Sequence, residues 1–403
     1  MFPILVYYLS VKFPVLETID ECKFKGDFMK NKFSTFLICA LGGLAIIGGA
    51  SVAAVAFSKN GTTKTFVQET DEQKAKKKIY SVEIDAANEE ITRCDDAVGL
   101  QAGTNGDLND FDHCYPWSSM KDVTVDASKY VNIDSFYFKI NLAQSKIKVS
   151  ISGYPYTGFT RSLMHVEGNK EYDSKLIGKY EASFADSNNK LVSVSGADVA
   201  ASITLASARE KAAVTGDNLY SYREHQMLQL LYLVEFAEVD SQEIWKGWTN
   251  SDHLIQTGGT DSMRGSSRGS AEECTAMAYR GIENWYGNTW TWIDGICTTK
   301  VNNENKIGVS WDVANNDDVD TYRIYDYDAI HNNQTAQGLI LFDMSEYSGD
   351  YFHLEYPEEG YYIGIVGGGY NNGSNAGAFC VYVDHSPSSS YGDSGFRLSR
   401  IPS

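Results

Sequence analysis

Side chains that could carry catalysis are scattered along this sequence. Its histidines stand at His113, His165, His225, His253, His331, His353 and His385. None is paired with another at the spacing of a metal site. The sequence holds no G-x-S-x-G, H-E-x-x-H or P-loop motif, and no G-x-G-x-x-G run that opens a predicted helix. We therefore predict no catalytic residues and no cofactor.

Two further groups could bind a metal or form a cross-link. Asp317, Asp318 and Asp320 form an acidic turn, but the D-x-D-x-D-G spacing of a calcium loop is missing. A solvated loop is the preferred interpretation, and we predict no metal site. The cysteines include no C-x-x-C pair, which argues against a zinc ribbon or a thioredoxin-like site. A Cys94–Cys114 disulfide is conceivable if the domain is exported.

The C-terminal segment has the composition of a binding surface. Rigid aromatic rings alternate there with short polar side chains, a mixture that antibody loops also use. Glycines such as Gly367 and Gly373 permit tight turns between them. We predict that ten side chains of this segment bind the ligand: Tyr370, Asn371, Asn372, Ser374, Asn375, Phe379, Tyr382, Asp384, His385 and Tyr391. An ordinary hydrophilic loop is the alternative.

The elements that must position these residues are short. Residues 129–140, 146–154, 175–184 and 190–196 alternate apolar and polar side chains, as strands do. Met227, Leu230, Leu231 and Val234 follow helical spacing and predict an amphipathic helix with its apolar stripe on a core. After residue 250 the chain is rich in loops. The pattern predicts an α+β domain over 91–403, with short strands, two core helices and long loops.

The N-terminal part predicts export. Residues 33–58 carry no charge and are long enough to cross a bilayer as a helix. Met29 with two lysines resembles the start of an export signal, so 1–28 would be an extension of the gene assignment. Residues 29–57 would then be a signal peptide or a transmembrane anchor, and the sequence is compatible with both interpretations. Residues 58–90 are polar without periodicity and predict a linker.

The charge balance narrows the partners. The chain carries 34 Lys+Arg against 53 Asp+Glu, a formal charge of -19. Such an acidic protein repels phosphate backbones, so nucleic acid is excluded as a partner.

Four segments resemble a known family. They are DFDHCYPWSSMK (110–121), MLQLLYLVEF (227–236), YRGIENWYGNTWTWIDGI (279–296), and GGGYNNGSNAGAFCVYV with the terminal GFRLSR. The sequence resembles the C-type-lectin-like variable proteins of diversity-generating retroelements, a family that includes phage tropism determinants and shares its fold with formylglycine-generating enzymes. The resemblance implies a rigid scaffold that presents a diversifiable binding region at about 360–400. It also implies that GFRL returns to the core, so that Phe396 and Leu398 are buried.

The resemblance also has a signature at the level of codons. In that family, adenine-directed mutagenesis of AAC or AAT codons cannot produce Lys, Glu, Gln, Met or Trp. Residues 360–403 contain none of these five types, whereas 1–359 contain 72 of them. At that rate roughly nine would be expected by composition. A Gly/Ser-rich loop that avoids long side chains would leave the same trace.

Some features of related folds are missing. Cys380 has no nearby partner for the cysteine pair of the oxidase-like enzymes, and the Glu-Pro-Asn and Trp-Asn-Asp motifs of calcium-dependent lectins do not occur. We therefore expect a surface-displayed receptor-binding or adhesin-like protein, membrane-anchored through residues 33–58 or secreted, or carried on a virion. Its expected partner is a protein or glycan on another cell or phage host, and an oligomer is compatible with this. An enzyme of the same fold and a structural surface or virion protein are the alternatives.

Overall fold

A computed structural model describes residues 53–57, 63–67, 69–85, 87–88, 90–143, 146–309, 323–326 and 348–402. The chain divides into two units, Met1–Thr70 and Asp71–Ser403. In the first unit, β1 (Ala53–Phe57) pairs antiparallel with β2 (Thr63–Val67). Most of the predicted span 33–58 lies outside the described residues, but its residues 53–57 form a strand rather than a helix. Within the described ranges, no helix has the length and apolarity needed to cross a membrane.

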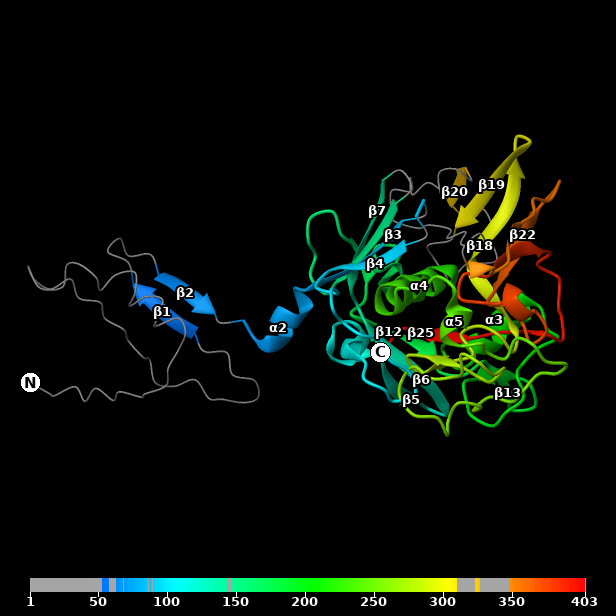
Figure 1. Ribbon diagram of the computed structural model, residues 1–403. Coiled ribbons are helices and arrows are strands. Elements are labelled where there is room, and N and C mark those ends of the chain that lie inside the picture. Colours follow the sequence, from blue (N-terminus) through cyan, green and yellow to red (C-terminus); the bar gives the residue numbers. More distant parts are fainter. Residues whose placement is uncertain are drawn as a thin grey trace, which may run out of the picture. The chain divides into compact units, whose positions relative to one another are not determined.

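The second unit is mostly β-structure (Figure 1). One sheet has the order β4-β3-β8-β7-β9, with bounds Glu90–Asp95, Ile79–Asp85, Lys146–Ser152, Tyr137–Ala143 and Thr160–Arg161. A second has the order β15-β25-β12-β6-β5, with bounds Asn218–Leu219, Leu398–Arg400, Ser174–Gly178, Ser128–Asp134 and Lys121–Val125. These short strands agree with the sequence-based expectation.

The third sheet carries the C-terminal segment. Its order is β20-β19-β18-β22-β23-β21, with bounds Arg323–Asp326, Glu304–Val309, Trp290–Val301, Tyr361–Val366, Val381–His385 and Phe352–Leu354. The short strand β24 (Ser394–Gly395) pairs parallel with β18. Small hairpins complete the β-structure: β10 (Val166–Glu167) with β11 (Lys170–Glu171), β13 (Ser183–Ala185) with β14 (Lys190–Val192), and β16 (Ala278–Tyr279) with β17 (Ile282–Glu283).

The described residues contain few helices: α2 (Asp71–Lys76), α3 (Leu205–Ala213), α4 (Tyr222–Phe236) and α5 (Ser241–Ile244). Single 3-10 turns occur at Asp110–His113, Trp117–Ser119, Leu163–His165 and Gly373–Asn375. The helix α4 begins with a capping box, in which Ser221 and Glu224 satisfy each other's backbone N–H groups. It ends at Ala237, which has a left-handed backbone with φ of 52°.

The amphipathic prediction for α4 is wrong, although Leu231 is buried as expected. All fifteen residues of α4 are buried, because the helix is covered on every side. Its polar side chains reach partners from distant segments. Glu224 forms an ion pair of 2.9 Å with Lys175, and the Gln229 side-chain amide donates to the Ala378 carbonyl at 2.8 Å. Buried polar groups need such partners to offset their lost hydration.

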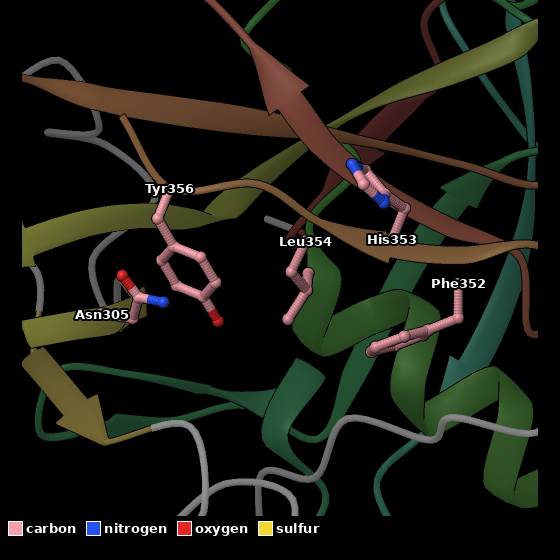
Figure 2. Close-up of a pocket in the computed structure, with 5 residues that line it drawn as sticks. All are labelled: Asn305, Phe352, His353, Leu354 and Tyr356. Atoms are coloured by element: carbon pink, nitrogen blue, oxygen red, sulfur yellow. The ribbon is translucent and has the colours of Figure 1, made fainter. Parts of the chain in front are cut away.

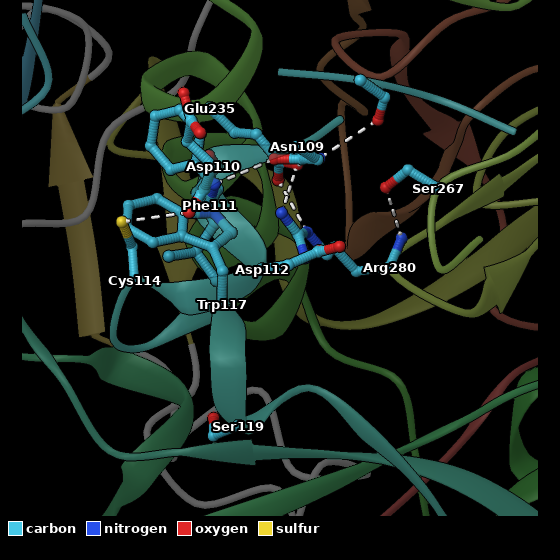
Figure 3. A network of polar contacts seen from close by, with 12 residues as sticks. Asn109, Asp110, Phe111, Asp112, Cys114, Trp117, Ser119, Glu235, Ser267 and Arg280 are labelled. Carbon is cyan, nitrogen blue, oxygen red and sulfur yellow. Dashed lines mark hydrogen bonds and ion pairs between the residues drawn. The ribbon is translucent and has the colours of Figure 1, made fainter. Parts of the chain in front are cut away.

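A buried ion pair anchors the last turn of α4 (Figure 3). The Arg280 Nε donates to Glu235 at 2.9 Å, and its guanidinium also contacts Asp112. The Asn109 side chain donates to Glu235 at 2.8 Å. Burial alone would lower the pKa of Arg280, but the Glu235 carboxylate raises it overall. The network therefore joins the turn at Asp110–His113, α4 and the β16–β17 hairpin.

One boundary prediction requires correction. Residues 58–90 are not a linker throughout, because β3 lies inside its sheet with Tyr80, Val82 and Ile84 buried. The domain therefore begins earlier than residue 91.

The Cys94–Cys114 disulfide considered from the sequence is not formed, since both cysteines are free. The predicted acidic turn at 317–320 lies outside the described residues, and no metal-binding cluster occurs in the ranges that the structure covers.

Candidate ligand-binding face

The strand β23 determines which C-terminal side chains reach the surface. It pairs antiparallel with β22 and parallel with β21, where His353 lies opposite Tyr382. Successive residues of a strand point to opposite faces of the sheet. Accordingly, Val381 and Val383 are buried in the core, whereas Tyr382 between them is partly exposed.

A continuous row of five rings runs from β21 across β23 to the following loop. We call Tyr351, His353, Tyr382, His385 and Tyr391 the aromatic face. Ring centroids are 5.3 Å apart for Tyr351 and Tyr382, 4.9 Å for His353 and Tyr382, 5.4 Å for Tyr382 and His385, and 5.2 Å for His385 and Tyr391. The terminal rings of the row, Tyr351 and Tyr391, are 40% and 43% exposed.

Two tryptophans of β18 support this row from below. Trp292 is fully buried, lies edge-on to His385 at 5.3 Å, and is near-parallel to Tyr391. Trp290 is 6.1 Å from the Tyr382 ring. Aromatic pairs at such separations stabilise one another beyond simple area burial. The rings of the aromatic face are therefore held in place before any partner arrives.

Two side chains of the aromatic face, His385 and Tyr382, have a defined protonation state at pH 7. Burial lowers the pKa of His385, although the adjacent Asp384 carboxylate opposes that shift, so the imidazole is neutral at pH 7. Burial, together with Asp384, raises the pKa of Tyr382 to about 12. The Tyr382 phenol therefore remains a hydrogen-bond donor across the physiological range.

A loop that follows β22, residues 367–375, lies beside the aromatic face, and we call it the polar loop. The Ser251 and Gly373 amides donate to the carbonyls of Tyr370 and Thr249, each at 2.7 Å. Gly368 has φ of 75°, and a Cβ there would come within 2.5 Å of the Ala376 Cβ, so only glycine fits. This loop has a fixed conformation set by its backbone contacts.

The polar loop and the aromatic face meet at two points. The Tyr351 amide donates to the Asn375 carbonyl at 2.9 Å. A Cβ on Gly369 would lie 3.2 Å from the Trp290 ring, the same ring that packs near Tyr382. The polar loop and the aromatic face are therefore neighbours.

The prediction for Phe379 is wrong. Its side chain is fully buried and lies 6.2 Å from the Tyr232 ring of α4. Its amide donates to the Asp350 carboxyl at 2.8 Å. The polar residues that precede it end at Asn375, and Ala376 through Cys380 turn into the core.

The other nine predicted residues are at least partly exposed. Asn371, Ser374, Asn375 and Tyr391 are exposed, and Tyr370, Asn372, Tyr382, Asp384 and His385 are half-buried. Phe396 and Leu398 are buried, as expected. Whether the nine side chains bind a ligand stays a prediction.

Sequence reasoning missed Tyr351 and His353, which belong to a separate segment of the chain. Their spacing by two, with Phe352 and Leu354 in the intervening register, is the signal that could have revealed a strand with one aromatic side. An open groove of about 320 Å³ lies along this strand, and Figure 2 shows its lining residues Asn305, Phe352, His353, Leu354 and Tyr356. His353 is shared by the groove and the aromatic face.

Comparisons with known proteins give only distant similarity. No family profile matches the sequence, and no curated relative is found. Among solved structures, the chain is similar to the Major Tropism Determinant M1 variant, with 12% identity over 89% of this chain and 82% of that one, and a TM-score of 0.30. The U1 variant is 11% identical over 87% of this chain and 81% of that one, with a TM-score of 0.28. The P3c variant is 12% identical over 91% of this chain and 85% of that one, with a TM-score of 0.29. Such values leave the function to be inferred from the site itself.

Proposed function

We propose that the chain is a surface-displayed binding protein whose aromatic face and adjoining polar loop capture a receptor on another cell or phage host. The observation that carries this proposal is the continuous row of rings between Tyr351 and Tyr391. Water solvates clustered aromatic rings poorly, so a contiguous row that is exposed at both ends and partly exposed between them favours a partner that covers it. The buried Trp290 and Trp292 beneath the row reduce the entropy lost on binding.

The polar loop supplies the second half of the proposed site. Asn371, Ser374 and Asn375 are exposed, short and able to donate or accept hydrogen bonds. Rigid rings beside such groups are the arrangement found in antibody binding loops. Diversification of residues about 360–400 would alter these side chains while leaving the buried Val381, Val383, Phe396 and Leu398 to hold the scaffold. Display through an N-terminal anchor, by secretion or on a virion is part of the same proposal.

The experiment uses the full chain, fluorescently labelled and incubated with a panel of bacterial cells, followed by flow cytometry. Tyr382→Ala combined with Tyr391→Ala should reduce cell capture at least tenfold, because exposed aromatic anchors dominate many interfaces. Tyr154→Ala is the matched control, since Tyr154 is 40% exposed but packs on Tyr156 in the β8–β9 connection. Equal capture by the double variant and the wild type would refute the proposal.

A further inference from the structure

The segment that builds the aromatic face has a one-sided charge. Residues 349–395 contain six carboxyl side chains and neither lysine nor arginine: Asp350, Glu355, Glu358, Glu359, Asp384 and Asp393. The next basic residue, Arg397, is buried and donates to the carbonyls of Gly178 and Glu283. This part of the chain therefore provides no cation of its own to the surface.

Three of these carboxylates act on the rings of the aromatic face. Asp384 contacts His385 directly, and the negative charges of Asp384 and Glu355 both raise the pKa of Tyr382. Asp393 and Asp384 both raise the pKa of His385 against the effect of burial. The backbone places the other two carboxylates beside this row, because the Glu355 amide donates to the Val383 carbonyl at 2.9 Å and the Trp290 amide donates to the Asp393 carbonyl at 3.0 Å.

Two of the remaining carboxyls are engaged within the protein. Asp350 is buried and accepts the Phe379 amide, so it does not face a partner. Glu358 pairs with Lys300. In contrast, Glu355 and Asp393 form no ion pair with any lysine or arginine of the described ranges. The surface thus combines partly exposed tyrosine rings with two carboxylates that have no lysine or arginine partner among the described residues.

We propose that the partner of the aromatic face is a protein that inserts arginine or lysine side chains between Tyr382, Tyr391 and the surrounding carboxylates. This inference rests on the proposed function and names the chemistry of the ligand. A guanidinium stacks on a tyrosine ring through its flat face and pairs with a carboxylate through its edge. Both interactions are available here within a single row of rings.

Other partners fit the surface less well. An anionic partner would be repelled by Glu355, Asp384 and Asp393. An uncharged glycan could stack on the rings, but it would desolvate the carboxylates without supplying a compensating charge. The neutral His385 adds no positive charge at pH 7 that could offset them.

The test measures binding of three labelled probes to the immobilised full chain: octa-arginine, octa-glutamate and the neutral sugar cellohexaose. Octa-arginine should bind tightest, and its affinity should fall with added salt. The combined variant Glu355→Gln, Asp384→Asn, Asp393→Asn should weaken it at least tenfold. The control variant Glu210→Gln, Glu272→Gln, Glu273→Gln removes the same charge from exposed positions elsewhere and should weaken it less than twofold.

Two results would overturn the inference: equal loss of octa-arginine binding in both triple variants, or tighter binding of cellohexaose than of octa-arginine. Its failure is separable from failure of the proposed function. If the Tyr382/Tyr391 double variant loses cell capture while the three-carboxylate variant keeps it, the aromatic face is the binding site but its partner is not cationic. Loss of cell capture in both variants, with the control variant unaffected, supports both.

Discussion

The buried indole of Trp292 lies nearly parallel to the exposed ring of Tyr391, with centroids 6.2 Å apart and an interplanar angle of 13°. Trp292 belongs to β18, whereas Tyr391 lies in the loop that follows β23. The contact therefore fixes a surface ring by means of a core residue. The C-terminal part of the chain thus contains two kinds of aromatic side chain, those buried in the fold and those that reach the surface, such as Tyr391.

This division predicts opposite effects for two aromatic substitutions. Phe379→Ala should lower the free energy of unfolding by about 3–5 kcal/mol, because a fully buried ring is removed from the core. Tyr391→Ala should change it by less than about 1 kcal/mol, since the ring is 43% exposed. Urea unfolding followed by tryptophan fluorescence measures both. Similar losses in the two variants would contradict the division.

Leu231→Ala should destabilise the second unit by about 2–5 kcal/mol, as truncations of core leucines do. Leu231 is fully buried in a helix that is covered on all sides, so the cavity cannot be filled by solvent. The measurement is the midpoint of urea unfolding by circular dichroism. The exposed Val214, which is 64% accessible, provides a control, and Val214→Ala should leave the midpoint unchanged.

Breaking the buried Arg280–Glu235 pair should cost more than removing it altogether. Arg280→Met leaves the Glu235 carboxylate buried without its cation and should destabilise by about 3–5 kcal/mol. Adding Glu235→Leu to Arg280→Met should restore part of that loss, because no uncompensated charge remains. A double-mutant cycle in urea unfolding quantifies the coupling, and strictly additive losses would show that the two side chains act independently.

The stability of the protein should fall in acid partly through His165. Burial lowers the pKa of His165 to about 3, so the folded protein holds the imidazole neutral while the unfolded chain binds the proton near pH 6.5. The contribution of His165 is complete above about pH 6.5 and decreases as the pH falls toward 3, by about 1.4 kcal/mol per pH unit. His165→Gln should flatten that slope by this amount.

The control for this pH experiment is His113→Gln, because the His113 side chain is exposed. That substitution should leave the acid slope of the unfolding free energy unchanged. An unaltered slope in His165→Gln would mean that the imidazole is also protonated in the folded state.

Local patterns in the sequence predicted the positions of helices and strands better than they predicted which of their side chains are buried. The spacing of Met227, Leu230, Leu231 and Val234 located α4, but not its complete burial. Gln229 and Glu235 look like solvent-facing residues in the sequence, because their partners Ala378 and Arg280 come from distant segments. Such long-range partners leave no trace in helical periodicity.

The same limit applied to the candidate site. The composition of 370–391 located nine side chains that reach the surface, but neighbouring polar residues misplaced Phe379. Tyr351 and His353 join the site only because β21 pairs with β23, a parallel contact between separated segments. At the N-terminal end, the lysines before residue 79 made β3 resemble a linker, although its residues 79–85 alternate as a strand does.

The strand β25 lies between β15 and β12, so a central position in one sheet is filled by residues near the C-terminus. The Arg397 side chain and the Gly178 carbonyl that it contacts are separated by 219 residues along the chain. At about 5–20 residues per second, a ribosome needs tens of seconds to supply this partner after β12 has emerged. The second sheet is therefore completed late in synthesis, and a prematurely terminated chain would keep a gap between β15 and β12. Only molecules translated through the segment that carries the aromatic face can complete this sheet, which couples correct assembly to the presence of that face.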